Sequence, residues 1–185
     1  SEKNRQVARD AVKMSMVLLK NESSALPLNK DQKITVVGSG ANNLGMQNGG
    51  WTVEWQGRST PDLKTLDSDK NEELSFSEVT SYFKSAYDSK YDAGNVEGFF
   101  KNLDKDSDKV VSMEEFTAFA TESPFQPSGT SILNALEGAS NSQDLVTYDP
   151  RAENLSKGEV IVAVVGENPY AEGIGDNPTI ELSSF

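Results

Sequence analysis

The chain has 185 residues, 36% of them hydrophobic, which is enough to bury at least one core in one or two domains. Its formal net charge of −12 argues against nucleic acid as a partner, because phosphates would repel it, and is compatible with cation binding or with solubility alone. No apolar run approaches the ~20 residues needed to cross a bilayer, so we expect no membrane partner.

Cysteine and histidine are both absent from the sequence. This excludes disulfides, thiolate nucleophiles, cysteine or histidine metal ligands, and serine–histidine triads. Any acid–base chemistry therefore has to use carboxylates.

The first 45 residues predict a helix, a strand and a glycine-rich turn. Apolar residues recur at three- and four-residue steps from Glu2 to Leu19, which is typical of one face of a helix. The run Lys33–Val37 is typical of a buried strand and leads into GSGANNLG, Gly38–Gly45. A dinucleotide-binding fingerprint would need a glycine where Asn43 stands, so we interpret these glycines as turn residues that supply positive φ.

Both tryptophans of the sequence, Trp51 and Trp55, lie in the stretch GGWTVEWQG. Positions four apart in a strand share a face, so the two rings could form a platform for a ligand. Packed inside the protein, they would instead be ordinary core residues. The residues alone leave both interpretations open.

An acidic segment follows. Between Ser59 and Gln126 the chain carries 15 acidic residues against 7 lysines. A shift in composition of this size marks an inserted module, to which we assign residues 59–128.

Two twelve-residue stretches of this module, DSDKNEELSFSE and DKDSDKVVSMEE, repeat one spacing of oxygen-bearing residues. Calcium takes about six to eight hard oxygen ligands, and a loop supplies them from positions one, three, five, seven through its carbonyl, nine and twelve. In the first loop these residues are Asp67, Asp69, Asn71, Glu73, Ser75 and Glu78. In the second loop they are Asp104, Asp106, Asp108, Val110, Ser112 and Glu115. The sequence therefore predicts two calcium sites; the alternative is a pair of solvated acidic loops.

The spacing resembles that of the EF-hand family. Leu74 and Val111 stand at position eight, where paired loops of that family form a short antiparallel bridge. Glu72 and Lys109 replace the usual glycine at position six, so we expect backbone strain there, and the first entering helix, 61–66, is short. Apolar stripes around the loops predict a small shared core, made of Phe76, Val79, Tyr82, Phe83, Val96, Phe99, Phe100, Leu103, Met113, Phe116 and Phe119. With few methionines and no evident target groove, the module is expected to be stabilised by calcium rather than switched by it.

Beyond the module, the pattern returns to helix and strand. The stretch GTSILNALEG predicts a helix over 129–138 with Ile132, Leu133 and Leu136 on one side, and Val146–Tyr148 predicts a short strand. The β-branched run Val160–Val165 predicts a strand that is buried on both faces of a parallel sheet.

A loop with two carboxylates, Glu167 and Glu172, follows this last strand. Open α/β sheets bind ligands beyond the carboxyl ends of their strands, so we look for chemistry here. The fold class is α/β: an incomplete parallel-sheet α/β sandwich, formed by residues 1–58 and 129–185, that is interrupted by a small all-α EF-hand pair at 59–128.

Outside the insert, the chain resembles the second domain of glycoside hydrolase family 3, particularly the exo-acting β-glucosidases and β-glucan exohydrolases. Two specific stretches, GGWT from Gly49 and GENPYAEG from Gly166, carry most of the resemblance. The other matching stretches are ARDAVKMSMVLLKNESSALPL from Ala8, ITVVGSGANNLG from Ile34 and GTSILNALEG from Gly129.

The resemblance implies a retaining β-glycosidase that acts on a β-glucan or β-glucoside, with its site between this sandwich and a preceding barrel domain of the same protein. Glu172 matches the acid/base glutamate of the family, with Glu167 as the runner-up, and such a role needs a carboxyl pKa above the ordinary value. Trp51 matches the tryptophan that stacks on the sugar, which leaves Trp55 to the core.

The barrel would supply the aspartate nucleophile, and no part of this sequence matches it. We therefore expect the chain to be a fragment, inactive alone, of a periplasmic or secreted enzyme, although the first residues, SEKNRQ, lack the apolar core of a signal peptide. The alternatives are a non-catalytic calcium-binding or scaffold protein on the same fold and a nucleotide-binding α/β protein, which the glycine pattern disfavours.

Overall fold

The computed structural model describes residues 1–52, 54–59, 61–87, 92–122, 128–173 and 175–176. The chain divides into two compact units, Ser1–Gln32 and Lys33–Phe185. Among the described residues, no helix combines the length and the apolar character that crossing a bilayer would require.

The first unit contains one regular helix, α1 (Glu2–Ser15), and a short 3₁₀ turn, η1 (Glu22–Ser24). Ser1 caps α1 by accepting a hydrogen bond from the Asn4 N–H. The helix ends at Ser15, four residues before the predicted end at Leu19. No residue of α1 is buried, so the side chains of its predicted apolar face are exposed to solvent.

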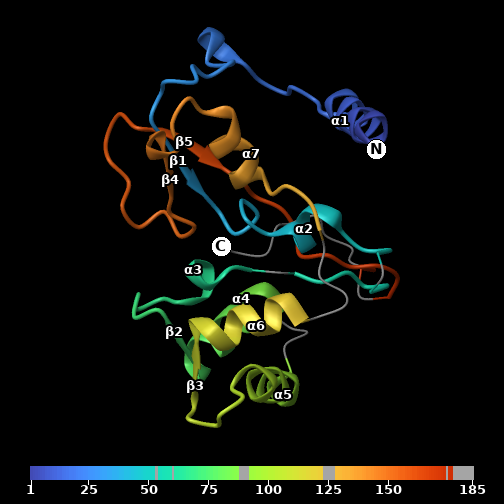
Figure 1. Ribbon diagram of the computed structural model, residues 1–185, viewed down its shortest axis with the longest axis vertical. Coiled ribbons are helices and arrows are strands. Elements are labelled where there is room, and N and C mark those ends of the chain that lie inside the picture. Colours follow the sequence, from blue (N-terminus) through green and yellow to red (C-terminus); the bar gives the residue numbers. More distant parts are fainter. Residues whose placement is uncertain (53, 60, 88–91, 123–127, 174, 177–185) are drawn as a thin grey trace. The chain divides into compact units, whose positions relative to one another are not determined.

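The second unit is built around a three-stranded parallel sheet of order β4-β1-β5. The central strand β1 (Ile34–Val37) pairs with β4 (Val146–Tyr148) and with β5 (Val160–Ala163), and the three strands lie side by side in Figure 1. All four residues of β1 are buried. The predicted central strand and the short strand at 146–148 are confirmed.

The prediction that the last strand is buried on both faces is wrong. β5 ends at Ala163 rather than Val165, and its residues alternate between half-buried and exposed, with Ile161 43% exposed. β5 lies at one end of the three-strand order, and only one of its faces is partly covered. An apolar run therefore does not by itself establish that both faces of a strand are covered.

Helix α7 (Ile132–Ala139) and the turn η3 (Gln143–Leu145) lead into β4. The side chain of Ser131 caps α7, and the N–H of Leu133 donates to the carbonyl of Ala41 at 2.8 Å, which fixes the helix beside the turn after β1. Leu133 is buried, but Ile132 is exposed, so the predicted apolar side of this helix is only partly covered.

The described residues 61–87 and 92–122 of the segment that was predicted to be an inserted module, called the module below, form two helix–loop–helix pairs. Its helices are α3 (Leu63–Leu66), α4 (Phe76–Tyr87), α5 (Ala93–Leu103) and α6 (Met113–Glu122), which Figure 1 shows grouped around two short strands. Those strands, β2 (Glu73–Ser75) and β3 (Val110–Ser112), pair antiparallel with Leu74 opposite Val111. The predicted bridge at position eight is therefore present.

The module has its own core. Leu74, Val79, Val96, Leu103 and Val111 are fully buried, and they pack with Leu63, Leu66 and Phe100. Tyr82, Phe83, Phe99, Phe116 and Phe119 pack around this cluster. Phe76 and Met113, predicted as core, are exposed because they begin α4 and α6 at the module surface, although Phe76 still makes an edge-on contact with Phe100.

Candidate functional site

Two loops meet at the carboxyl edge of the parallel sheet. The first loop follows α2 (Leu44–Asn48), a short helix after β1, and carries both tryptophans; its described residues, 49–52 and 54–57, are called the tryptophan loop. The second loop follows β5 and carries Glu172. Gln56 joins them: its side-chain oxygen accepts from the Ala171 N–H at 2.9 Å, and its side-chain nitrogen donates to the Glu172 carbonyl at 3.0 Å. A side chain from one loop thus fixes the backbone of the other next to Glu172.

Glycine makes this close approach possible. A Cβ atom on Gly50 would lie 1.8 Å from the Tyr170 carbonyl oxygen, and one on Gly57 would lie 2.5 Å from the Cβ atom of Pro169. Contacts of that length are impossible for any side chain, so only glycine allows the two backbones to come together. The GGW stretch is therefore required by packing as well as by any ligand.

The tryptophan loop is not a strand, yet both rings are at the surface. Trp51 is 67% exposed and Trp55 is 48% exposed, and their rings meet edge to face with centroids 5.9 Å apart. The assignment of Trp55 to the core is therefore wrong. The loop turns back on itself, with the Trp51 N–H donating to the Trp55 carbonyl at 2.8 Å, and this presents both rings together.

The two carboxylates after β5 have different surroundings. Glu167 accepts a hydrogen bond of 2.6 Å from the Tyr170 hydroxyl, and this bond raises the pKa of Tyr170. The side chain of Glu172 is exposed, so it does not point into the packed interior. Glu167 thus has a positioning partner within the loop, whereas Glu172 faces outward from it.

The first acidic loop is organised around Asp67 and Glu78. The side chain of Asp67 is buried and accepts from the backbone N–H groups of Lys70 at 2.7 Å and Glu72 at 3.0 Å. Glu78 accepts from Ser68 and Asp69 through one oxygen and from Ser75 through the other. Carboxylate oxygens of Asp67, Asp69 and Glu78 all lie within 4.8 Å of one another.

The second loop brings Asp104, Asp106 and Asp108 within the same distance of one another. Asp104 is only 9% exposed; one of its oxygens accepts from the Lys109 N–H, but the other, Oδ1, is buried without any hydrogen-bond partner. A buried charged oxygen without a partner is costly, so the chemistry of this atom is suited to binding a cation. Glu115 binds the backbone of Lys105 and Ser112 instead of joining the aspartates.

Hydrogen bonds also set the charge state of the two position-twelve glutamates. Burial alone would raise the pKa of Glu78, but hydrogen bonds from Ser75 and Ser68 outweigh it and lower the pKa to about 2. Hydrogen bonds, first from the Ser112 backbone, also lower the pKa of Glu115. Both groups are held ionised, as hard metal ligands must be.

The remaining predicted ligands lie on the same loops. Asn71 accepts from the Glu73 N–H, and Asp108 accepts from the Val110 N–H. Glu73 and Val110, the two position-seven residues, are the first residues of β2 and β3. The hydroxyls of Ser75 and Ser112 bind the position-twelve glutamates. Glu72 and Lys109 have φ of 66° and 79°, so the expected left-handed backbone at position six is present.

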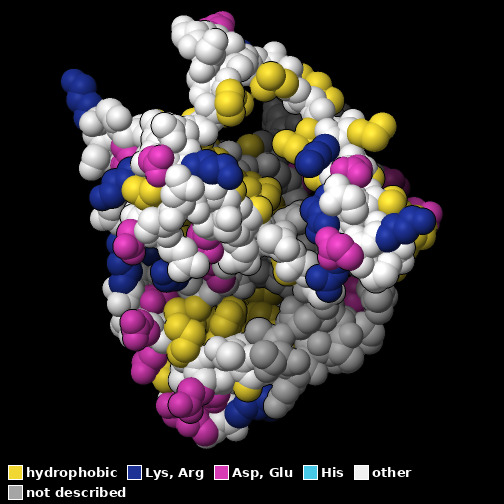
Figure 2. Space-filling model, turned by 45° about the horizontal axis from the view of Figure 1, so that its top comes forward, with side chains coloured by type: hydrophobic (Ala, Val, Ile, Leu, Met, Phe, Trp, Pro, Cys, Tyr) yellow, Lys and Arg dark blue, Asp and Glu magenta, His cyan; other side chains and the backbone are white. Residues whose placement is uncertain are grey.

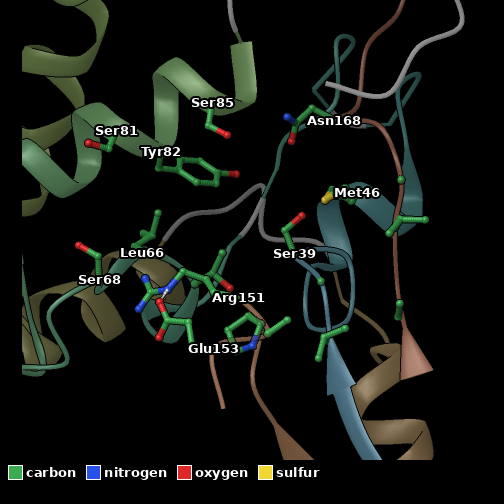
Figure 3. A pocket seen from close by; sticks show the side chains of 18 of the residues that line it. Ser39, Met46, Leu66, Ser68, Ser81, Tyr82, Ser85, Arg151, Glu153 and Asn168 are labelled. Atoms are coloured by element: carbon green, nitrogen blue, oxygen red, sulfur yellow. Dashed lines mark hydrogen bonds and ion pairs between the residues drawn. The ribbon is translucent and has the colours of Figure 1, made fainter. Parts of the chain in front are cut away.

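Sequence reasoning missed two cavities. One, of about 680 Å³, lies between the carboxyl edge of the sheet and the first helix–loop–helix pair, and Figure 3 shows Arg151, Glu153 and Ser68 on one side of it and Met46 and Asn168 on another. The other, of about 450 Å³, is lined by aromatic rings of the module, among them Tyr82, Phe83, Phe99, Phe116 and Phe119, and by Glu54, Gly57, Arg58, Ser59, Pro61 and Asp62 of the preceding linker. No sequence pattern indicated this apolar cavity, because its lining combines residues of the module with residues of the segment before it.

The fold and these loops define a class of protein: a parallel-sheet α/β domain that presents aromatic rings and a carboxylate at the carboxyl edge of its strands. Residues 16–185 match the model of the glycosyl hydrolase family 3 C-terminal domain, and the chain belongs to that family. A comparison with curated proteins found no match.

Solved structures agree with the family. The chain is similar to an exo-1,3/1,4-β-glucanase (ExoP) from a Pseudoalteromonas species, with 28% identity and a TM-score of 0.50 over 91% of this chain. A Q683A mutant of the same enzyme matches with 27% identity and a TM-score of 0.46 over 95% of this chain. The chain spans 14% and 18% of the lengths of those two chains.

Proposed function

We propose that this chain is the sandwich half of a retaining, exo-acting β-glucosidase or β-glucan glucohydrolase, and that Glu172 is its acid/base. One observation carries the proposal: the exposed Glu172 lies on a loop whose backbone is bound by Gln56, so an outward-facing carboxylate and two open tryptophan rings share one edge of the sheet. The substrate class follows from the family and from the glucanase to which the chain is similar.

The chemistry assigns one task to Glu172 and another to a partner domain. A retaining glycosidase needs one carboxylic acid that protonates the departing oxygen and later deprotonates water, and a carboxylate nucleophile about 5–5.5 Å away. Glu172 would take the first role. The nucleophile would come from the barrel domain of the parent protein, which would also cover Glu172 and exclude water from it.

Trp51 would bind the sugar, and Trp55 would support it. Sugar C–H faces pack well on aromatic rings, and the more exposed ring of the pair, Trp51, is open to such a contact. The edge-to-face contact with Trp55 restrains the orientation of the Trp51 ring.

The test is made in the full-length parent protein with an aryl β-glucoside whose leaving group needs little protonation. Glu172→Ala should lower the rate of deglycosylation by about 10²–10⁴-fold, the usual contribution of general acid–base catalysis, and azide should restore it by attacking the glycosyl intermediate. The matched control is Glu167→Gln, which removes the carboxylate that binds Tyr170.

If azide restored the rate of the Glu167 variant and not that of the Glu172 variant, Glu167 would be the acid/base in place of Glu172. An unchanged rate in Glu172→Ala would reject Glu172 as the acid/base. A parent protein that hydrolyses no aryl β-glucoside would favour the alternative, a non-catalytic calcium-binding or scaffold protein on the same fold.

We also propose that the two acidic loops bind calcium. The ligands would be the six residues of each loop named above, and the unpartnered Oδ1 of Asp104 is the observation that supports a cation there. The donor set consists only of oxygen, which is the set that calcium prefers and that softer metals do not. The resemblance to EF-hands extends to the short bridge between Leu74 and Val111.

Calcium titration of the purified chain tests this proposal. Calorimetry should count two sites, and saturation at about 100 to 1,000 times Kd should stabilise each loop by ~2–4 kcal/mol, measured as a rise in Tm. Glu115→Gln should remove one site and leave the other. Unchanged heat and Tm on addition of calcium would leave the solvated-loop alternative.

A further inference from the structure

We propose that calcium in the first loop, Asp67–Glu78, controls the placement of the tryptophan loop, whereas calcium in the second loop, Asp104–Glu115, acts on it only through the bridge between the loops. This inference rests on the proposed calcium sites and concerns regulation of the proposed sugar-binding edge. It differs from the expectation of a purely stabilising metal.

The first connection joins the first loop to the turn after β4. Arg151 donates to the Asp67 carbonyl at 2.7 Å, and Glu153 bridges Arg151 at 3.0 Å and Lys70 of the loop at 2.9 Å. Figure 3 shows Arg151 and Glu153 next to each other beside Ser68. The same turn is tied to the sheet, because the Pro150 carbonyl accepts from the N–H of Gly38, directly after β1.

The second connection runs from the helix that carries Glu78 to the helix that precedes Trp51. Tyr82 lies one turn after Glu78 on α4, and its hydroxyl is 2.8 Å from the Ser59 hydroxyl. Ser59 also accepts from the side-chain nitrogen of Asn43 at 2.9 Å. The oxygen of the same Asn43 side chain caps α2, which ends immediately before the tryptophan loop.

Burial makes this second connection stiff. Asn43 is only 1% exposed, and a Cβ atom on Gly45 of α2 would lie 1.5 Å from the Arg58 carbonyl oxygen. Because α2 is packed so closely against the linker that leads into the module, it cannot move independently of that linker. A shift of α4 therefore has to be passed on to α2 and to Trp51.

Within the described part of the chain, the second loop has no comparable connection to the sheet or to α2. Side chains of Asp104–Glu115, all within the described part of the chain, make their hydrogen bonds inside the loop, as in the pairs Lys109–Asp104 and Lys105–Glu115. Its link to the first loop is the β2–β3 pairing. The two loops share a ligand pattern but differ in what they are attached to.

Glu78, whose carboxylate already lies within 4.8 Å of those of Asp67 and Asp69, would be held there when calcium is bound, and the start of α4 would be fixed with it. Tyr82, on the same helix, would then hold Ser59 and Asn43 in one position, and Arg151 would hold the loop against the sheet. Without calcium the same attachments would form, but the loop and the start of α4 that they hold would be less constrained. Effective couplings between two sites are typically about 5- to 150-fold in affinity, and we expect the low end of that range for the sugar.

The test uses tryptophan fluorescence, because Trp51 and Trp55 are the only tryptophans of this chain and both lie in the loop. Calcium alone should change the emission. Glu115→Gln should keep that change and Glu78→Gln should abolish it, while calorimetry shows one remaining site in each variant.

A third variant separates coupling from binding. Tyr82→Phe combined with Arg151→Gln removes both connections but no proposed ligand, so it should still bind two calcium ions by calorimetry with little or no change in emission. In the full-length parent protein, chelation should raise KM for an aryl β-glucoside about 5-fold, at the low end of typical couplings, and should do so in Glu115→Gln but not in the third variant.

The outcomes distinguish this inference from the proposals on which it rests. If calorimetry of the unaltered chain shows no heat of calcium binding, both the metal sites and the coupling are overturned. Two outcomes overturn the coupling alone. In the first, calcium binds by calorimetry but the tryptophan emission does not change. In the second, the emission change is lost in Glu115→Gln and kept in Glu78→Gln. Hydrolysis that fails at every calcium concentration rejects the glycosidase proposal without affecting the fluorescence result.

Discussion

The module and the parallel sheet of the second unit cover their apolar side chains to different degrees. The module packs eight buried residues from α3, β2, α4, α5 and β3 into one cluster. In the sheet, β1 is buried throughout, but β5 leaves Ile161 43% exposed and Val165, just after it, 49% exposed. On the face shown in Figure 2, apolar side chains lie open among charged ones.

The contacts that build each region also differ in range. The bridge between Leu74 and Val111 joins residues of a single module, whereas the hydrogen bonds of Gln56 to Ala171 and Glu172 join residues more than 100 positions apart. Closing a longer loop costs more entropy, so the sheet edge depends on the whole unit being folded. The proposed metal sites can therefore form from residues close together in the sequence, whereas the proposed sugar-binding site at the carboxyl edge of the sheet requires the whole unit to be folded.

Truncating the module core should have the largest effect on stability. Leu74→Ala removes a fully buried side chain at the bridge and should lower the free energy of unfolding by about 2–5 kcal/mol, the usual range for a buried leucine. Urea unfolding of the calcium-free chain measures this loss. The matched control, Ile161→Ala on β5, should cost less, because much of that side chain already contacts solvent. Equal losses would mean that β5 is as well covered as the module core.

Breaking the glycine contact at the sheet edge should have an intermediate effect. Gly50→Ala places a Cβ atom 1.8 Å from the Tyr170 carbonyl, so one loop has to move, at about 1–3 kcal/mol if the cost resembles that of overpacking a core. The fluorescence of Trp51 and Trp55 should change with it. The measurement is urea unfolding together with the emission spectrum.

Gly98→Ala is the control for this glycine. Gly98 lies inside α5, where a Cβ would meet nothing within 4 Å, so alanine should stabilise the module by about 0.5–1 kcal/mol. Unaltered stability and fluorescence in Gly50→Ala would show that the two loops are not held together by their backbones.

Sequence patterns predicted the local features and missed the long-range ones. The bridge at position eight and the positive φ of Glu72 and Lys109 follow from spacing within twelve residues, and both are present. The central strand β1 was evident from its apolar run for the same reason. Each of these features depends on residues that are neighbours along the chain.

The errors and omissions share the opposite property. The exposure of Trp55 depends on a loop that turns back on itself, and the half exposure of β5 depends on what covers the sheet, neither of which periodicity reports. The connection from Tyr82 to Asn43 uses common polar residues at distant positions, which carry no signal in a single sequence. The acid/base candidate came from a family resemblance, because an exposed glutamate has no local pattern of its own.

The smallest predicted effect concerns a carboxylate that serves the sheet rather than the module. Glu159 precedes β5 and accepts a hydrogen bond from the hydroxyl of Thr35 in β1 and another from the Ser156 N–H. The bond from Thr35 is the main reason why the pKa of Glu159 is lowered.

A carboxyl whose pKa is lower in the folded protein stabilises the fold at pH above its ordinary value of 4.5 and loses that contribution as the pH falls below it. Glu159→Gln should therefore lower Tm slightly at neutral pH, and this difference should shrink as the pH falls below 4.5 and the unaltered side chain becomes protonated. Since other carboxylates titrate over the same range, the quantity to measure is the difference in Tm between the two proteins at each pH. A difference that stays constant with pH would mean that the charge of Glu159 does not help to hold β5 beside β1, and that the neutral hydrogen bond to Thr35 is enough.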